Sequence, residues 1–211
     1  MNGAILVLGA GGHAKVLVDA LLAGGLAPLG LLDRDPARVG QEVLGCPVLG
    51  TDAALAGFDP RETLLVNGLG STRHVGARAA LFTRLLEQGY RFLSVIHPSA
   101  VVAASAGLGQ GVQIMAGAVV QAGAVLGDNV ILNTGARLDH DSRLGDHVHA
   151  APGATVCGGV RVGANTHLGS GATVIEGTTI GKHCLIGAGA VVVRDVPDGV
   201  TALGVPARWT V

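Results

Sequence analysis

The sequence predicts a chain of two unlike parts, a small α/β domain followed by an all-β domain of stacked parallel coils. Two observations support this fold class. Apolar runs alternate with glycine-rich turns and helical patterns over the first ninety or so residues. From Ile96 onward the chain instead repeats every six residues, with glycines at intervals of eighteen. We expect the α/β domain at residues 1–94, the coils at 95–197 and a tail at 198–211.

The first part shows the strand, turn and helix pattern of an α/β domain. The segment AILVLGAGGHAKVLVDALLAGG, residues 4–25, predicts a buried strand, a glycine-rich turn and an amphipathic helix. PLGLLD predicts a second strand that ends at Asp33, TLLVNGLG from Thr63 predicts a third, and GARAALFTRLLEQG predicts a second helix. Because about three strands make a small sheet, one nucleotide diphosphate is an easier ligand than both halves of NAD.

The glycine-rich turn has the outline of the dinucleotide-binding motif of Rossmann-like domains. Gly9, Gly11 and Ala14 fit GxGxxA, and Asp33 follows about twenty residues after the turn. Amides at the start of the helix can hold a phosphate, and the acid is placed for a ribose or a base. A tight turn without a ligand is the simpler alternative. An NAD-dependent sugar oxidoreductase is another, and only this motif suggests it.

The second part is a regular repeat. From Ile96, seventeen consecutive blocks of six residues keep their register, and each block except the one at Ala150 begins with Val, Ile or Leu. Three blocks make one turn, because five glycines from Gly109 to Gly181 are eighteen residues apart. We expect the first-position side chains to fill a narrow interior, with strands pairing between coils at about 4.8 Å. The five aromatic residues all lie outside the repeat, as such an interior requires.

Charge and composition favour a small-molecule partner. The net charge of −1 gives no electrostatic reason to expect nucleic acid or an anionic membrane surface. The stretch 92–127 has no charged side chain, but Gly, Ser, Pro and three glutamines interrupt it, so we expect no membrane span. The start of the chain has no cationic leader, which favours a cytoplasmic protein. Three cysteines without CxxC spacing argue against a disulfide framework and against a structural zinc site.

The repeat resembles that of the left-handed β-helix acyltransferases. Five segments together narrow the resemblance: GAGGHAKV (9–16), LLDRD (31–35), VIHPSAVV (95–102), NTGARLDHD (133–141) and GVPAR (204–208). They are similar to the bacterial NeuD/PglD-like family, which includes sialic acid O-acetyltransferases and nucleotide-amino-sugar N-acetyltransferases of the bacillosamine and perosamine pathways. The resemblance spans almost the whole chain. It implies a homotrimer that uses acetyl-CoA and no metal, with the cofactor between neighbouring β-helices and near the tail.

The same resemblance implies an acceptor and a catalytic pair. The acceptor is an amino sugar carried by UDP or GDP, and a sialic acid hydroxyl is the alternative. His140 matches the general base of the family, and Asp141 matches its carboxylate partner, which is Glu in some relatives. Both residues fall at a corner of the predicted coil, where an imidazole can accept the proton that an attacking amine loses. A surface histidine without any role is the simpler alternative. Asn133 matches a polar residue near the catalytic centre.

Further residues are matched to ligand contacts by the resemblance. The cofactor set has His149 at the pantetheine and thioester and Gly158 with its amide facing the thioester, and it comprises His149, Gly158, Ser170 and Ala188. In the substrate set, His13 in the glycine-rich turn matches a residue on the substrate side, Asp33 and Asp35 lie near the base, and Ser71 and Arg73 lie near the phosphates. The whole set comprises Gly9, Gly11, Gly12, His13, Asp33, Asp35, Ser71 and Arg73. Simpler alternatives are corner positions for Asn133 and Gly158, a solvated charge for Arg73, and stacked neighbours for His149 and His167.

A zinc lyase of the carbonic anhydrase type is the alternative from another class, since it also uses a left-handed β-helix. It requires three histidines that converge across a subunit boundary, for which His140, His149 and His167 are the candidates. The His-x4-His spacing associated with that family is absent from this pattern, and the N-terminal domain would have no task. We expect the remaining histidines to be structural: His74, His97, His147 and His183.

Overall fold

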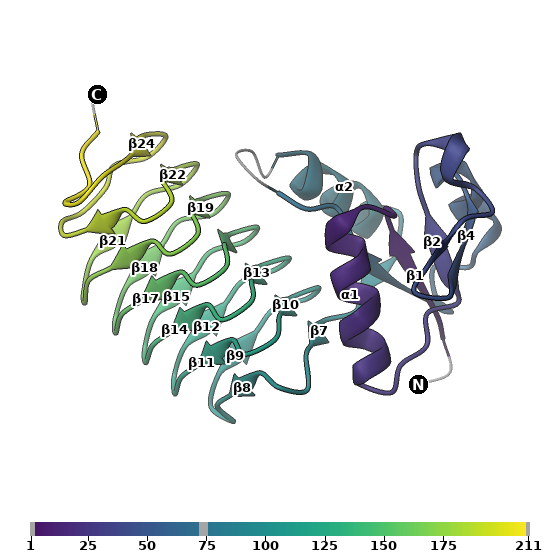
Figure 1. Ribbon diagram of the computed structural model, residues 1–211, viewed down its shortest axis with the longest axis horizontal. Coiled ribbons are helices and arrows are strands. Elements are labelled where there is room, and N and C mark those ends of the chain that lie inside the picture. The colour runs from purple at the N-terminus through teal and green to yellow at the C-terminus, as the bar shows by residue number, and fades with distance from the viewer. Residues whose placement is uncertain (1–2, 72–75, 210–211) are drawn as a thin grey trace.

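A computed structural model describes residues 3–71 and 76–209, and it shows two domains side by side (Figure 1). The N-terminal domain is a sheet in the order β3-β4-β2-β1-β5-β6. All neighbours are parallel except β3 and β4. The elements are β1 (Ala4–Leu8), α1 (Gly12–Ala23), β2 (Gly30–Leu32), η1 (Pro36–Arg38), β3 (Glu42–Val43), β4 (Cys46–Gly50), η2 (Asp52–Gly57), β5 (Thr63–Asn67), α2 (Gly76–Glu87) and β6 (Arg91–Phe92).

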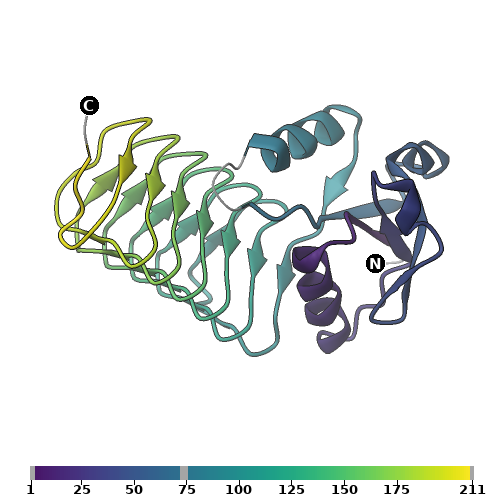
Figure 2. The same ribbon diagram turned by 45° about the horizontal axis from the view of Figure 1, so that its top comes forward.

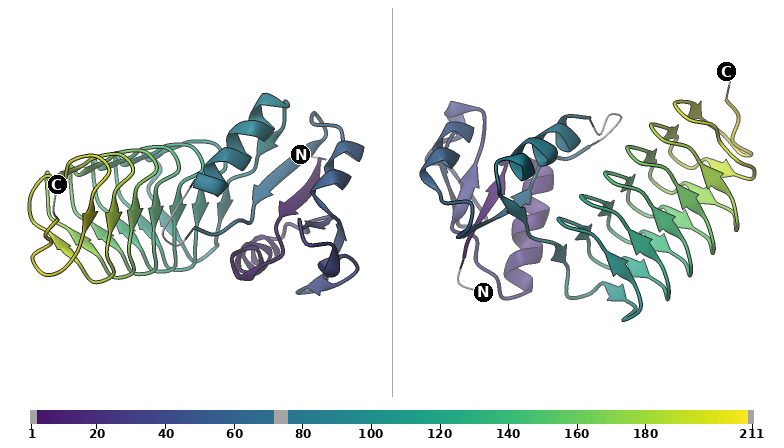
Figure 3. Two further views of the ribbon diagram at one scale, coloured as in Figure 1. Left: turned by 90° about the horizontal axis from the view of Figure 1, so that it is seen from above. Right: turned by 180° about the vertical axis from the view of Figure 1, so that it is seen from behind.

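The two long helices cover opposite faces of this sheet (Figure 3). Alternation along β1 explains the arrangement, because successive side chains of a strand point to opposite faces. Val7 belongs to the cluster packed on α1, whereas Leu6 and Leu8 belong to the cluster packed on α2. Met115, from the second domain, joins the α1 cluster and is fully buried. Helix α1 is therefore the layer between the sheet and the coils (Figure 2).

The sheet is larger than the sequence predicts. Strands β1, β2 and β5 and both helices lie where the patterns predict them, but β3, β4 and β6 extend the sheet at its two edges. The expectation of about three strands is therefore wrong. Strands β3 and β6 have only two residues each, too few to show a period. Strand β4 alternates buried and exposed residues, but it is short and contains Pro47, which disfavours a strand.

The second domain is a three-sided parallel β-helix of two-residue strands. Strands on successive coils pair eighteen residues apart, as in the pairing of Gln113 with Ile131, except that Leu185 near the end of the chain pairs with Thr201. This confirms the predicted turn of three blocks. The first sheet comprises β7 (Val95–Ile96), β10 (Gln113–Ile114), β13 (Ile131–Leu132), β16 (His149–Ala150), β19 (His167–Leu168), β22 (Leu185–Ile186) and β24 (Thr201–Ala202).

The second and third sheets complete each coil. The second comprises β8 (Val101–Val102), β11 (Val119–Val120), β14 (Arg137–Leu138), β17 (Thr155–Val156), β20 (Thr173–Val174) and β23 (Val191–Val192). The third comprises β9 (Gly107–Leu108), β12 (Val125–Leu126), β15 (Arg143–Leu144), β18 (Arg161–Val162) and β21 (Thr179–Ile180). We call the turns from the first to the second sheet the first corner, and those from the second to the third sheet the second corner.

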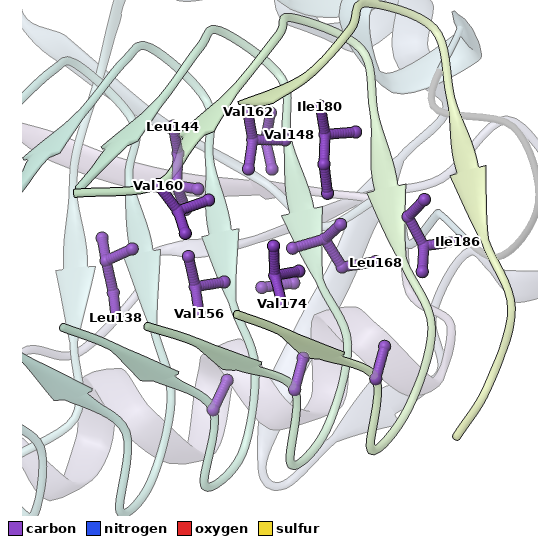
Figure 4. Close-up of a cluster of buried hydrophobic side chains, with 14 of the residues drawn as sticks. Leu138, Leu144, Val148, Val156, Val160, Val162, Leu168, Val174, Ile180 and Ile186 are labelled. Atoms are coloured by element: carbon purple, nitrogen blue, oxygen red, sulfur yellow. The ribbon is translucent and has the colours of Figure 1, made fainter. Parts of the chain in front are cut away.

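The first-position aliphatic side chains fill the interior of the coils, as predicted. Leu138, Val156 and Val174 stack on successive coils, and each is fully buried (Figure 4). The glycines spaced by eighteen are required by close stacking of the coils. A Cβ on Gly163 would lie 2.6 Å from the backbone carbon of Gly181. Within the described part of the chain, no helix is both long enough and apolar enough to span a bilayer.

Candidate active site

His140 and Asp141 form a pair on the second corner, in the turn between β14 and β15. The Nδ1 of His140 lies 3.0 Å from Oδ2 of Asp141, and the side chains are 58% and 75% exposed. The hydrogen bond to Asp141 raises the pKa of His140, and the charge of Asp139 adds to the effect. A carboxylate on Nδ1 holds the proton there, which leaves the Nε2 lone pair free in the neutral ring.

The backbone of Asp141 marks this corner as unusual. Its φ is +57°, in the left-handed region that favours glycine. The equivalent residues of the coils before and after are Gly123 and Gly159, with φ values of +71° and +67°. An aspartate therefore occupies a position that glycine fills on both neighbouring coils. Asn129, His147, Asn165 and His183 have the same conformation at the turns from the third to the first sheet, so the backbone of Asp141 is unusual only among the turns of the second corner.

Gly158 lies directly against the edge of the His140 ring that carries Nε2. A Cβ at this residue would be 2.6 Å from Nε2 of His140 and 2.7 Å from its Cε1. Any side chain here would displace the imidazole. Gly158 therefore does more than an ordinary corner glycine would, because its lack of a side chain makes room for the imidazole that is predicted to be the base.

A second group of predicted residues meets at a hollow beside the first corner. This hollow, which we call the solenoid hollow, has a volume of about 810 Å³ and extends along the first sheet up to Leu203 in the tail. It brings together seven residues of the predicted sets: Gly12, His13, Ser71, Asn133, His149, Ser170 and Ala188.

His149 is held by hydrogen bonds from both ring nitrogens. Nδ1 lies 2.7 Å from the carbonyl oxygen of Ser71, and because a carbonyl only accepts, Nδ1 carries the proton. Nε2 then accepts from Nδ2 of Asn133 at 3.2 Å. Burial, with the neighbouring His167, lowers the pKa of His149 to about 3, so the ring is neutral. His149 and His167 are also paired neighbours on successive coils, with ring centroids 4.8 Å apart.

The glycine-rich turn opens into a second hollow of about 810 Å³, here called the turn hollow. Helix α1 begins here, with Gly11 as its N-cap, no side-chain cap and no acidic residue in its first turn. Gly9 needs glycine because its φ is +92°. Gly11 and Gly12 do not, since a Cβ on either would meet no atom within 4 Å. These two glycines leave the helix amides open to a ligand.

Asp33 stabilises the glycine-rich turn through hydrogen bonds to backbone amides. Its Oδ2 accepts from the amide of Ala10 at 2.6 Å, and its Oδ1 accepts from the amide of Asp35 at 2.9 Å. Asp35 in turn caps the amide of Ala37 at 3.0 Å. Asp33 lines the turn hollow, whereas Asp35 lines neither hollow. The two acids thus have structural bonds in addition to the base contacts predicted for them.

The chain does not bring all predicted residues to one place. His140, Asp141 and Gly158 line neither hollow, because they lie on the second corner. Arg73 and His74 lie outside the described residues. Sequence reasoning missed Gln113, Gly70 and Arg78, because the contact of Gln113 with Asn67, the place of Gly70 in the hollow and the contact of Arg78 with Asn67 all join residues that are separated in the sequence. Among residues 3–71 and 76–209, no three His, Cys, Asp or Glu side chains converge as metal ligands.

Both domains are similar to known protein families. A model described as the PglD N-terminal domain matches residues 4–85. The bacterial transferase hexapeptide model matches residues 105–140 and 141–176, and the hexapeptide repeat of succinyl-transferase matches residues 159–194. The acetyltransferase domain of PglB from Neisseria gonorrhoeae, solved with acetyl coenzyme A, is 39% identical with a TM-score of 0.92, and the match covers 100% of both chains. The chain belongs to the PglD-type hexapeptide-repeat acetyltransferases.

Other solved members agree with the fold of this acetyltransferase. PerB from Caulobacter crescentus, solved with CoA and GDP-perosamine, is 42% identical with a TM-score of 0.91, covering 100% of this chain and 99% of the other. WeeI from Acinetobacter baumannii is 25% identical with a TM-score of 0.80, covering 98% and 99%. The comparison with curated protein sequences gave no match. The predicted left-handed β-helix acetyltransferase fold is confirmed, and family membership argues against the zinc lyase and the NAD-dependent oxidoreductase.

Proposed function

We propose that this acetyltransferase moves an acetyl group from acetyl-CoA to the amine of a nucleotide-linked amino sugar. The observation that carries the proposal is the pair of hollows, which share Gly12, His13 and Gly70. A diphosphate fits the open amides at the start of α1, and the sugar then extends past His13 toward the solenoid hollow. PerB, which was solved with CoA and GDP-perosamine, supports this choice of ligands.

The chemistry proposed for the chain is general base catalysis. Acetyl-CoA supplies the acyl group as a thioester. His140 takes, on Nε2, the proton that the amine loses as it attacks the carbonyl carbon, and it returns a proton to the departing thiol sulfur. Asp141 stabilises the imidazolium that forms between these steps. Gly158 lies beside the ring, and its amide is proposed to donate to the oxyanion.

We propose that the active unit is a homotrimer, because within one chain the predicted site residues lie on two separate corners of the coils. His140, Asp141 and Gly158 are on the second corner, whereas Asn133, Ser170 and Ala188 are on the first. Rotation about a threefold axis beside the coils brings the second corner of one chain to the first corner of the next. Acetyl-CoA would lie in the groove between them, with the tail residue Leu203 at its edge.

An O-acetyltransferase acting on free sialic acid is the second candidate. It would share the solenoid hollow and the base. The turn hollow favours the nucleotide-linked acceptor, because a free sialic acid has no diphosphate for the uncapped start of α1 or for the open space at Gly11 and Gly12.

A thiol-release assay tests the proposal. Acetyl-CoA is offered with a panel of UDP- and GDP-linked amino sugars, the matching nucleotide sugars that carry a hydroxyl in place of the amine, and free sialic acid. We expect turnover only with an amine-bearing nucleotide sugar. His140→Ala should lower kcat by about a hundredfold or more, with acetyl-CoA binding retained. Turnover of sialic acid alone would contradict the acceptor, and an unchanged kcat in the variant would contradict the base.

A further inference from the structure

Gln113 reaches from the first sheet of the coils to the glycine-rich turn of the other domain. Its side chain is 1% exposed. Oε1 lies 2.7 Å from Nε2 of His13, and Nε2 of Gln113 lies 2.8 Å from the carbonyl oxygen of Asn67, at the end of β5. The buried amide therefore bridges two loops of the N-terminal domain, and both of these loops border the turn hollow.

The orientation of this amide is fixed by its partners. A carbonyl oxygen can only accept, so the group facing Asn67 is the NH2 of Gln113, and the group facing His13 is the oxygen. Arg78, which is 2% exposed, donates from Nη1 to the same carbonyl at 2.6 Å and to that of Leu69 at 2.9 Å. The flipped amide is excluded, because its oxygen would then face the carbonyl oxygen of Asn67 at 2.8 Å.

The consequence falls on the ring of His13. An amide oxygen only accepts, so Nε2 of His13 carries the proton and Nδ1 keeps its lone pair. Nδ1 has no hydrogen-bond partner among residues 3–71 and 76–209, and the ring lines both hollows. We propose that Gln113 is a positioning residue of the acceptor site: it holds His13 as the Nε2-protonated tautomer, so that Nδ1 is a hydrogen-bond acceptor for the sugar amine or a neighbouring hydroxyl.

The surroundings of His13 keep the ring neutral and so keep Nδ1 an acceptor. Burial lowers the pKa of His13 to about 4, the positive charge of Arg78, from α2, acts in the same direction, and the hydrogen bond to Gln113 opposes them only in part. His149, from β16, is a further titratable group near the ring, and it is itself neutral. A neutral hydrogen-bond acceptor at this point favours a substrate group that carries N–H or O–H. An amino sugar offers such groups.

This inference rests on the proposed function for its ligand, but the state of the ring can be measured without one. We expect nitrogen NMR of selectively labelled histidine, assigned with His13→Asn, to show His13 protonated on Nε2 and free of titration between about pH 5 and 8. A wild-type His13 protonated on Nδ1, or charged near pH 7, would overturn the inference. This result is independent of whether any nucleotide sugar is acetylated.

Gln113→Glu tests the consequence for the substrate. A carboxylate on Nε2 favours the imidazolium, which turns Nδ1 into a donor. We expect KM for the nucleotide amino sugar to rise about tenfold or more at pH 6, to recover as the pH rises and His13 loses its proton, and to leave KM for acetyl-CoA unchanged. The same KM in variant and wild type at every pH would overturn the inference. Gln113→Leu should raise KM at all pH values, since it cannot select a tautomer.

Asn129 provides the matched control. It is fully buried on the next coil, has a φ of +57° that glycine tolerates, and accepts from Nδ2 of Asn67 at 3.3 Å without touching His13. Asn129→Gly should lower stability and leave the pH dependence of KM as in the wild type. An equal effect of Asn129→Gly and Gln113→Leu on KM would assign Gln113 to domain packing alone and overturn the inference.

Discussion

At the scale of single residues, His140 differs from the other histidines of the site in its exposure. Burial lowers the pKa values of His13 and His149 to about 4 and about 3, so these rings stay neutral at physiological pH. Asp141 raises the pKa of the exposed His140, and a base with a raised pKa is protonated at higher pH. We therefore expect the acid limb of the activity profile to belong to His140.

The pH profile tests this assignment. We expect kcat/KM to fall as the pH decreases through the raised pKa of His140, because protonation removes the lone pair on Nε2. Asp141→Asn should lower the rate and move this limb to lower pH, since the neutral amide no longer favours the imidazolium. A limb that stays in place in the variant would show that another group titrates.

Gly158→Ala tests the position of the imidazole. The added methyl would meet Nε2 of His140, which is the end of an exposed and flexible side chain. We expect kcat to fall about tenfold or more because the base is displaced, with little change in melting temperature. Gly57→Ala is the control, since a Cβ there meets nothing within 4 Å. Equal kcat for Gly158→Ala and wild type would remove the contact from the mechanism.

At the scale of elements, the residues at the start of helix α1 are not those that would best stabilise the helix. An aspartate or serine at the N-cap would stabilise the helix, yet Gly11 leaves the first amides without a side-chain partner. Gly11→Asp should therefore raise the melting temperature slightly, and it should weaken nucleotide sugar binding about tenfold or more by repelling the diphosphate. Calorimetry of UDP and GDP binding measures the effect. Unchanged binding would contradict a phosphate site at this helix.

The elements also show how far the sequence predicts the fold. Six-residue periodicity over seventeen blocks gave the register of the coils, so the positions of Leu138 and Val156 in the interior were predictable. Strands β3 and β6 were not, because two residues carry no period and the neighbouring strands determine their pairing. Within the site, the bonds from Ser71 to His149 and from Gln113 to His13 join residues 78 and 100 positions apart, and no local pattern encodes them.

At the scale of the whole molecule, the proposed active site is shared between neighbouring chains. The predicted base lies on the second corner, and the solenoid hollow lies beside the first. Each active centre would therefore take His140 from one chain and Ala188 from its neighbour. Light scattering should give three times the chain mass of 20.9 kDa.

Mixed trimers test the shared site most directly. His140→Ala removes the base, and Ala188→Trp fills the exposed edge of the hollow, so each variant alone should be inactive in acetyl transfer. Co-expression of the two in equal amounts should restore about a quarter of the wild-type rate, because one interface in four then combines an intact His140 with an intact hollow. No recovery in mixed trimers of confirmed composition would contradict the shared site, since both halves would then belong to the same chain.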